Sequence, residues 1–398
     1  MVIYRKTWAE INLDAIYNNV SQFKKRLAQN REIMAVVKAD GYGHGAIPVA
    51  KTALKAGASW LATALLEEAI ELRKAGLEVP ILVMGYVPAQ HIPLAQRYQI
   101  RITVPDYAYF TELVHGLSSS QPPLLFHVKL DTGMGRLGMY DYDELARVVD
   151  EFHRFKGGSN QLVWEGLFSH LATADGEEEE QERILASQVQ AFDQMVSFLR
   201  EQGIKPALIH LANSAALIRQ TFGRYSNAVR LGISLYGLLP SAWMNQKLPF
   251  QLQPALSLYS HLSQVKRLPP ESGISYGCTY RTKGYEWIGT VPIGYADGYS
   301  RLLSNKGIVL IGGKPCPVVG RVCMDQLMVK LDRPYPRGAR VTLIGRQGNQ
   351  QISADHLARW IGTINYEITC QISKRVPRLY IGSNPEVRDL VSHPSPVS

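Results

Sequence analysis

The stretch IMAVVKADGYGHG, at residues 33–45, joins a short apolar strand to a lysine and a glycine-rich turn. Seven more apolar runs follow, and between them lie stretches with helical spacing such as 65–75 and 178–202. With the first run included, the predicted strands lie at 33–39, 60–64, 81–85, 101–104, 124–131, 162–171, 207–212 and 228–233. Eight strands that alternate with helices and wind in one direction predict a (β/α)8 TIM barrel.

The pattern changes after Leu239-Pro240, where helical spacing gives way to short strands and turns rich in Gly or Pro. Strands are predicted at 257–267, 287–295, 307–311, 326–331 and 340–345, and short helices at 353–361 and 365–371. We therefore predict an α/β barrel domain at residues 1–245 and a mostly β domain at 246–383. A flexible tail rich in Pro and Ser is predicted at 384–398.

The composition limits the classes of protein that the chain can belong to. It has 398 residues, a hydrophobic fraction of 46% and a net charge of +9, which excludes a disordered or coiled-coil protein. Because the Lys and Arg residues are dispersed, we expect a small anionic ligand rather than nucleic acid. Four cysteines without a CxxC pair, and no apolar run that could be a signal peptide or cross a membrane, predict a reduced cytoplasmic protein. No metal site is predicted.

Polar side chains occur near the ends of five predicted barrel strands, on the side where barrel enzymes carry out chemistry. They are Lys38, Arg136, His170, the pair Asn213 and Ser214, and Arg230. A lysine at the end of an apolar strand is costly unless its ammonium reaches water or loses its proton. Lys38 is therefore either a surface lysine or a Schiff-base lysine with a lowered pKa. The glycines at 41, 43 and 45 would let a ligand approach the backbone.

An anion site is predicted beside this lysine. ANSAAL, at 212–217, is typical of a helix start whose N–H groups bind phosphate, with Gly232 and Ile233 opposite it. Ser214 could bind the phosphate, cap the helix, or do both. A lysine and a phosphate cup suggest pyridoxal phosphate, although a phosphorylated sugar would fit as well. GMGRLG, at 133–138, matches the GxGxxG fingerprint, but no helix follows it directly, so we reject an NAD site.

Nine motifs occur in order along the chain. They are VVKADGYGHG (36–45), KLDTGMGRLG (129–138), FSHLATAD (168–175), ANSAAL (212–217), VRLGISLYG (229–237), ISYGCTY (274–280), IGYADGYSR (293–301), GRVCMDQ (320–326) and INYEI (364–368). Together they resemble the alanine racemases, which are pyridoxal-phosphate enzymes with a TIM barrel followed by a β domain. The resemblance extends from about Trp8 to Tyr380, and Leu231 and Lys330 are departures at positions without chemistry.

The resemblance implies a role for each matched residue. Lys38 is expected to hold the cofactor as a Schiff base and to move a proton on one face of it. Tyr276 of the partner subunit in a homodimer is expected to move a proton on the opposite face. Arg230 is expected to donate to the pyridine nitrogen. The positions around the phosphate are matched by Tyr42, Ser214, Gly232, Ile233 and Tyr366, with Asn213 and His170 in supporting positions. The groups that hold the substrate carboxylate are matched by Arg136 and the Met324 backbone. Lys129 matches a lysine that many members carry as a carbamate.

The expected function is interconversion of L-alanine and D-alanine by two bases, which supplies D-alanine for cell-wall peptidoglycan. A serine or broad-specificity racemase of the same family is the nearest alternative. A fold-related pyridoxal-phosphate decarboxylase would place a carboxylate rather than Arg230 opposite the pyridine nitrogen. A cofactor carrier made of the barrel alone would not need a second domain with Tyr276.

Overall fold

The computed structural model describes residues 4–156 and 161–391, and the chain divides into two compact units. The first, here called the barrel unit, consists of residues 15–41 and 49–253. The second, here called the β unit, consists of residues 1–14 and 42–48 together with the chain from 254 onward. The β unit thus includes two short segments from the N-terminal part of the sequence, in addition to the predicted C-terminal domain.

The barrel unit contains the eight predicted parallel strands. They are β2 (Glu32–Val36), β3 (Trp60–Thr63), β4 (Ile81–Val83), β5 (Ile102–Val104), β6 (Leu124–Lys129), β7 (Leu162–Phe168), β8 (Leu208–His210) and β9 (Ala228–Leu231). Their order in the sheet is β4-β3-β2-β9-β8-β7-β6-β5. A parallel bridge between Leu82 and Arg101 joins the two outermost strands, so the barrel is nearly closed. The TIM-barrel prediction is confirmed.

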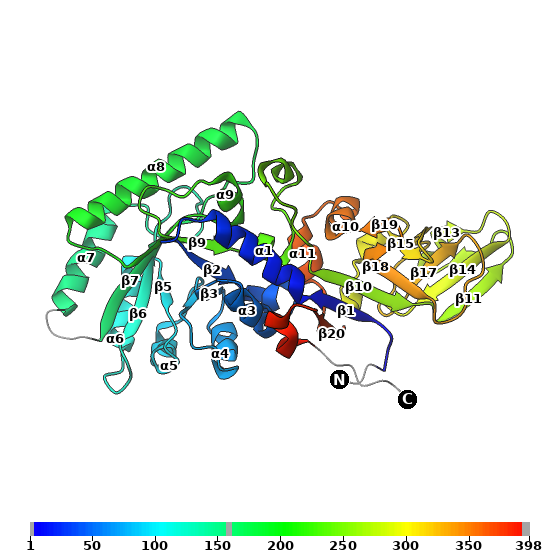
Figure 1. The fold of residues 1–398 in the computed structure, drawn as a ribbon, viewed down its shortest axis with the longest axis horizontal. Helices are drawn as coiled ribbons and strands as arrows, with labels where there is room; N and C mark the ends of the chain where they lie inside the picture. The colour runs from blue at the N-terminus through cyan, green and yellow to red at the C-terminus, as the bar shows by residue number, and fades with distance from the viewer. Residues whose placement is uncertain (1–3, 157–160, 392–398) are drawn as a thin grey trace. The chain divides into compact units, whose positions relative to one another are not determined.

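One helix precedes the first barrel strand and the others follow strands, and they lie on the outer side of the strands (Figure 1). They are α1 (Leu13–Arg26), α3 (Ala46–Lys55), α4 (Leu66–Lys74), α5 (Ile92–Arg97), α6 (Tyr107–Gly116), α7 (Tyr142–Lys156), α8 (Glu179–Glu201) and α9 (Ser214–Arg219). Acidic residues of the run at 177–180 begin α8, where they complement the helix dipole as predicted. Between the strands and these helices, the rings of Phe126 on β6 and Trp164 on β7 pack 5.5 Å apart, and Phe126 also packs on Phe110 of α6.

The β unit is built from mostly antiparallel strands and two short helices. Its strands are β1 (Trp8–Asn12), β10 (Leu256–His261), β11 (Gln264–Leu268), β12 (Gly273–Ile274), β13 (Tyr280–Arg281), β14 (Glu286–Val291), β15 (Ile308–Ile311), β16 (Lys314–Pro317), β17 (Leu327–Leu331), β18 (Arg340–Gln347), β19 (Gln350–Ile352) and β20 (Arg378–Ile381), and its helices are α10 (Ala354–Ile361) and α11 (Asn365–Cys370). The larger sheet has the order β16-β15-β18-β10-β1-β20, with β19 paired to β18. Strands β11, β14 and β17 form a second sheet, and β12 and β13 form a hairpin.

The structure differs from the sequence predictions for this unit in several places. The single strand predicted at 257–267 is two strands in different sheets, because Leu262 N–H bonds to Ala339 and Ser263 N–H to Thr290. Strand β1, which the sequence did not indicate, pairs antiparallel with β10 and parallel with β20. In the segment predicted as a tail, residues 385–390 form a 3-10 helix with Val387 buried, and residues 392–398 lie outside the described part.

Candidate functional site

Lys38 follows strand β2 directly and begins a turn of unusual handedness, α2 (Lys38–Tyr42). Ala39, Asp40 and Tyr42 have φ values of 51°, 52° and 51°, which is the left-handed helical region. That region costs a non-glycine residue roughly 1–2 kcal/mol. Three such residues in one turn represent strain of the kind that persists where a functional group must be held in place.

Glu68 on α4 holds this turn. One of its carboxylate oxygens accepts a hydrogen bond from the backbone N–H of Ala39 at 2.6 Å. The other accepts from the N–H groups of Ala64 and Leu65, at 2.9 and 3.1 Å. Glu68 was not predicted as a site residue, because an acidic residue in the first turn of a helix has an ordinary role at the helix dipole.

Two of the three glycines predicted to let a ligand approach, Gly43 and Gly45, instead allow close packing within the protein. A Cβ atom on Gly43 would lie 2.0 Å from the backbone oxygen of Thr369, and one on Gly45 would lie 1.9 Å from the hydroxyl of Tyr380. Both contacts lie within the β unit. These glycines therefore allow residues 42–48 to pack closely in that unit.

Four cationic side chains lie close enough to His170 in the barrel unit to influence its charge. Burial lowers the pKa of His170 well below its usual range, and the charges of Arg230, Lys129, Arg136 and Lys38 lower it further. The imidazole is therefore neutral at pH 7. This group of cations, here called the cation cluster, combines residues from the ends of three strands, β2, β6 and β9, and would attract a ligand with several negative charges.

Lys129 is the buried ammonium of the cation cluster, with 4% of its surface exposed. Burial and then the charges of Arg230 and Arg136 lower its pKa to about 7, while Asp131 opposes this change. Its Nζ atom lies 4.9 Å from the ring centroid of Phe168. An amine with such a pKa is largely unprotonated just above neutral pH, so it can act as a nucleophile.

Arg230 on β9 is the most strongly held residue of the cluster. Its Nη1 group donates to the Nδ1 atom and the carbonyl of His210, at 2.8 and 3.0 Å. Its Nη2 group donates to the carbonyls of Ser169 and Leu211 and to Nδ1 of His170, at 2.7, 2.9 and 3.2 Å. Burial and the charge of Arg136 lower its pKa to about 9, so it remains a cation at pH 7. Within the described residues, the Nε–H group is the one donor of Arg230 without a partner.

Arg136 lies in the loop that matched the dinucleotide fingerprint. The Asp131 carboxylate accepts hydrogen bonds from four backbone N–H groups of this loop, at 2.8 to 3.1 Å, including that of Arg136. Helix α7 begins only at Tyr142. The loop is therefore organised by its own aspartate, and the Arg136 side chain is exposed at its surface.

The predicted phosphate cup is formed by α9 and the end of β9. Asn213 caps the helix, because its Oδ1 atom accepts from Ala216 N–H at 3.0 Å. The hydroxyl of Ser214 instead accepts from the N–H groups of Gly232 and Ser234, at 2.9 and 3.5 Å. The N-cap role considered for Ser214 is therefore wrong. The hydroxyl of Ser234 is buried and has no partner among the described residues, so the cup has unused hydrogen-bonding capacity.

Two pairs of predicted residues meet in the β unit. The rings of Tyr42 and Tyr366 lie 6.0 Å apart, and Tyr42 is buried. Ile233, which was also predicted around the phosphate, is buried in the barrel unit. Tyr276 and Met324 line a hollow of about 420 Å³ together with Cys323. Tyr276 is 73% exposed, and its hydroxyl makes no hydrogen bond within the described residues.

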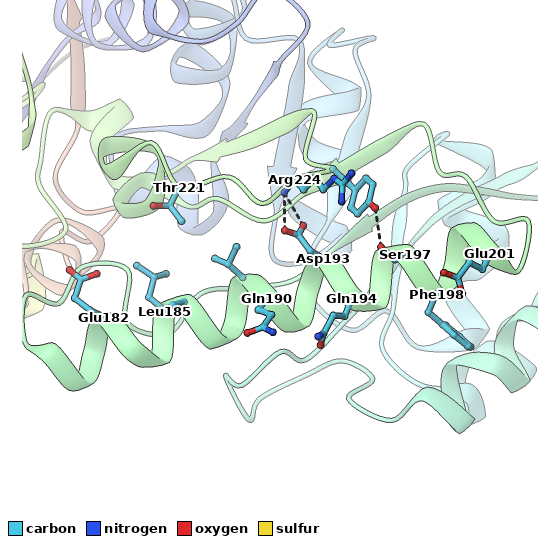
Figure 2. A pocket seen from close by; sticks show the side chains of 13 residues that line it. Glu182, Leu185, Gln190, Asp193, Gln194, Ser197, Phe198, Glu201, Thr221 and Arg224 are labelled. Atoms are coloured by element: carbon cyan, nitrogen blue, oxygen red, sulfur yellow. Dashed lines mark hydrogen bonds between the residues drawn. The ribbon is translucent and has the colours of Figure 1, made fainter.

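Another hollow, of about 810 Å³, lies along α8 in the barrel unit (Figure 2). The Asp193 carboxylate accepts hydrogen bonds from Arg224 N–H at 2.9 and 3.0 Å (Figure 2). The hydroxyls of Ser197 and Tyr225 pair at 2.9 Å. The polar groups of this hollow thus connect the loop at 221–225 to helix α8. None of the predicted site residues lines the hollow. Among the described residues, no group of His, Cys, Asp and Glu could hold a metal ion, and no helix is long and apolar enough to cross a membrane.

The donor set fits pyridoxal phosphate. The Nε–H group of Arg230 is available to a ring nitrogen, Lys38 provides an amine, and the cation cluster with the Ser214 cup suits a phosphate. A barrel with these groups at its strand ends, followed by a β domain, defines a pyridoxal-phosphate-dependent barrel enzyme.

The comparisons with known proteins agree over nearly the whole length. Models of the N-terminal and C-terminal domains of alanine racemase match residues 11–240 and 255–380, and the chain belongs to the alanine racemase family. The alanine racemase of Geobacillus kaustophilus is 47% identical over 98% of both chains. That of Geobacillus stearothermophilus is 48% identical over 95% of this chain and 94% of its own.

Solved structures agree with this assignment. The crystal structure of alanine racemase from Bacillus anthracis with bound L-Ala-P has a TM-score of 0.90 and 45% identity, and covers 96% of each chain. The crystal structure of alanine racemase from E. faecalis has a TM-score of 0.88 and 40% identity, and the match covers 96% of this chain and 100% of that one. The two-domain fold class predicted from the sequence is therefore that of the family.

Proposed function

We propose that this protein is a pyridoxal-phosphate-dependent racemase that interconverts L-alanine and D-alanine. The observation that carries the proposal is the state of Arg230, which is held by five hydrogen bonds and keeps its Nε–H available. A guanidinium does not readily give up a proton, so a ring nitrogen that accepts from it stays unprotonated. This favours return of a proton to the α-carbon over transamination. The family assignment over both domains supports the same activity.

Two groups of the protein move the proton. The bound cofactor supplies an electron sink that makes the α-proton of the amino acid acidic. Lys38 removes or returns this proton on one face, and Tyr276 of the partner subunit does so on the other. Two bases on opposite faces allow inversion without rotation of the bound substrate. The strained turn after Lys38, held by Glu68, supports the view that the lysine is kept in a defined position.

Other residues bind the ends of the two small molecules. We assign the substrate carboxylate to the Arg136 guanidinium and the backbone N–H of Met324. The phosphate is assigned to Tyr42, Ser214, Gly232, Ile233 and Tyr366, with Asn213 and His170 in supporting positions. The hydrogen bonds of Asn213 and Ser214 and the contact between the two tyrosine rings support this assignment.

Lys129 is proposed to be carbamylated. Its unprotonated amine attacks the carbon of CO2, one N–H proton leaves to water, and a carbamate anion remains. A pKa of about 7 and the neighbouring cations Arg230 and Arg136 support this step, because they favour the neutral amine and then stabilise the anion. The product would convert a buried cation into an anion next to Arg136.

We further propose a homodimer with shared active sites in the cytoplasm, where the product serves peptidoglycan synthesis. Tyr276 and Met324 are 73% and 52% exposed, although both are assigned to the reaction. Exposed catalytic groups on the β unit are explained if the barrel unit of a second chain covers them. Cys278, Cys316 and Cys323 form no disulfide, which fits a reducing compartment.

Product analysis tests the proposal and its alternatives together. Purified protein supplied with pyridoxal phosphate and L-alanine should form D-alanine without release of CO2. A decarboxylase would release CO2, and a cofactor carrier would leave L-alanine unchanged. Either result would overturn the proposal. Parallel assays with L-serine decide whether the enzyme is specific for alanine, because a serine racemase would turn over serine faster.

A further inference from the structure

A row of polar side chains that the proposed reaction does not use runs through the interior of the barrel. His210 Nε2 lies 3.0 Å from Nδ1 of His127, and His127 Nε2 lies 3.3 Å from the carboxylate of Glu165. That carboxylate accepts two hydrogen bonds from Arg101, at 2.9 and 3.1 Å. Together with the bond between Arg230 and His210, the row connects the end of β9 with Arg101, which lies just before β5.

The chemistry of the two ends determines the direction of every hydrogen bond in the row. An arginine only donates, so Nδ1 of His210 must accept from Arg230 and its single proton must be on Nε2. Nδ1 of His127 must then accept from His210, which places the proton of His127 on Nε2, where it is donated to Glu165. Both histidines are thus neutral and share one tautomer.

The surroundings of the two imidazoles agree with neutral rings. His127 and His210 are fully buried, and burial lowers the pKa of each. The charges of Arg230 and Lys129 face His210, whereas Arg101 and Glu165 face His127. The ring of Phe168 stacks on His210 with centroids 4.7 Å apart and an interplanar angle of 7°.

Gly166 on β7 lacks a side chain at the point where the His127 ring of the row lies against the strand. A Cβ atom at this position would lie 2.4 Å from Nδ1 and Cε1 of His127. The backbone of Gly166 is not in the left-handed region, so its conformation does not require glycine. A Gly166→Ala substitution would therefore displace the His127 ring without removing any charge.

We propose that His210 and His127 are positioning residues that tie Arg230 to the Glu165–Arg101 ion pair and hold its terminal nitrogens in place. The Nε–H group of Arg230 is then the donor left for the cofactor. This last step rests on the function proposed above, but the order of the hydrogen bonds does not. Loss of the row should let the guanidinium move by a fraction of an ångström, and misplacement by about 1 Å can cost roughly 100-fold in rate.

The hydrogen-bond order is tested by nitrogen NMR of the holoenzyme labelled with ¹⁵N in its histidines. The signals are assigned with His127→Asn and His210→Asn variants. We expect an unprotonated Nδ1 and a protonated Nε2 in both residues at pH 7. A proton on Nδ1 of either residue, or an imidazolium, would overturn the proposal and would leave the racemase assignment untouched.

The link to the cofactor is tested with Glu165→Gln and Gly166→Ala, and with Glu151→Gln as a control in the exposed pair with Arg154. We expect both variants in the row to lower kcat by roughly 10- to 100-fold with little change in KM, and to shift the visible absorption of the bound cofactor. The control should match the wild type in kcat, in KM and in the visible absorption of the cofactor. If Gly166→Ala does not fold, Glu165→Gln decides. Unchanged absorption and kcat in Glu165→Gln, with the expected tautomers, would show that the row does not position Arg230.

Discussion

The two units differ in how they hold the residues assigned to the reaction. In the barrel unit, Arg230 and Lys129 are 3% and 4% exposed, and Arg230 makes five hydrogen bonds. In the β unit, Tyr276 and Met324 are 73% and 52% exposed, and the Tyr276 hydroxyl has no partner within the described residues. The barrel residues are therefore held within one chain, whereas the exposed residues of the β unit fit the proposed homodimer, in which a second chain covers them. The predictions below test this contrast, beginning with the largest effect.

Lys38→Ala should abolish racemisation, with a loss of about 10⁴-fold or more, because it removes both the amine that holds the cofactor and one base. In the wild type, borohydride should attach the chromophore to the peptide with residues 36–45, as identified by mass spectrometry. Lys266→Ala, which removes an exposed lysine of β11, serves as the control and should label normally. Labelling of Lys129 or Lys266 in the wild type would contradict the assignment of Lys38.

Tyr276→Phe should separate the two directions of the reaction. Without its hydroxyl, exchange of the α-proton with deuterated water should persist for D-alanine and fall by about 10²- to 10⁴-fold for L-alanine. Proton NMR of the recovered amino acid measures both rates. Tyr285→Phe, at a tyrosine 65% exposed in the same unit, should leave both unchanged. Equal exchange from the two enantiomers would mean that one base serves both faces.

Gly43→Ala should destabilise the protein more than Gly76→Ala, although both glycines have a φ of 82°. At Gly76 a Cβ meets no atom within 4 Å, so only backbone strain of about 1 kcal/mol is expected. At Gly43 the clash with the Thr369 carbonyl should add about 1–3 kcal/mol to the loss in free energy of unfolding. Urea unfolding of both variants measures the difference. Equal losses would show that residues 42–48 do not pack as described.

The pH dependence of stability should reveal the state of Lys129. Because its folded pKa of about 7 lies below the ordinary value of 10.5, the unfolded chain binds more protons between these values. The free energy of unfolding of the wild type, relative to Lys129→Met, should therefore rise with pH across this range in CO2-free buffer. Bicarbonate should extend this rise to below pH 7, because the carbamate of the folded chain binds no proton there whereas the amine of the unfolded chain does. A flat difference in CO2-free buffer would contradict the lowered pKa.

The barrel was predictable because its strands are short apolar runs between helical stretches, a pattern visible in any local window. Strand β1 was not, because its pairing with β20 joins residues more than 360 positions apart and nothing in WAEIN distinguishes it locally. The left-handed turn at 39–42 was also hidden, since only one of its four residues is glycine.

Within the proposed site, Lys38 and Arg230 could be predicted because charged residues are rare at the ends of apolar strands. His127 and His210 were not, although each lies within a predicted strand. His127 alternates with Lys129 on β6, and this two-residue spacing places both on the same face of the strand. That spacing was the available signal, but the partner on β8 is known only from the structure.

The central claim, that the two bases come from different chains, is tested most directly by mixing Lys38→Ala and Tyr276→Phe subunits after mild dissociation. Each parent should be nearly inactive. A hybrid dimer contains one site with both bases, so random reassociation should restore about a quarter of the wild-type activity. Native mass spectrometry confirms that hybrids have formed. Hybrids that form and remain as inactive as their parents would show that both bases come from a single chain.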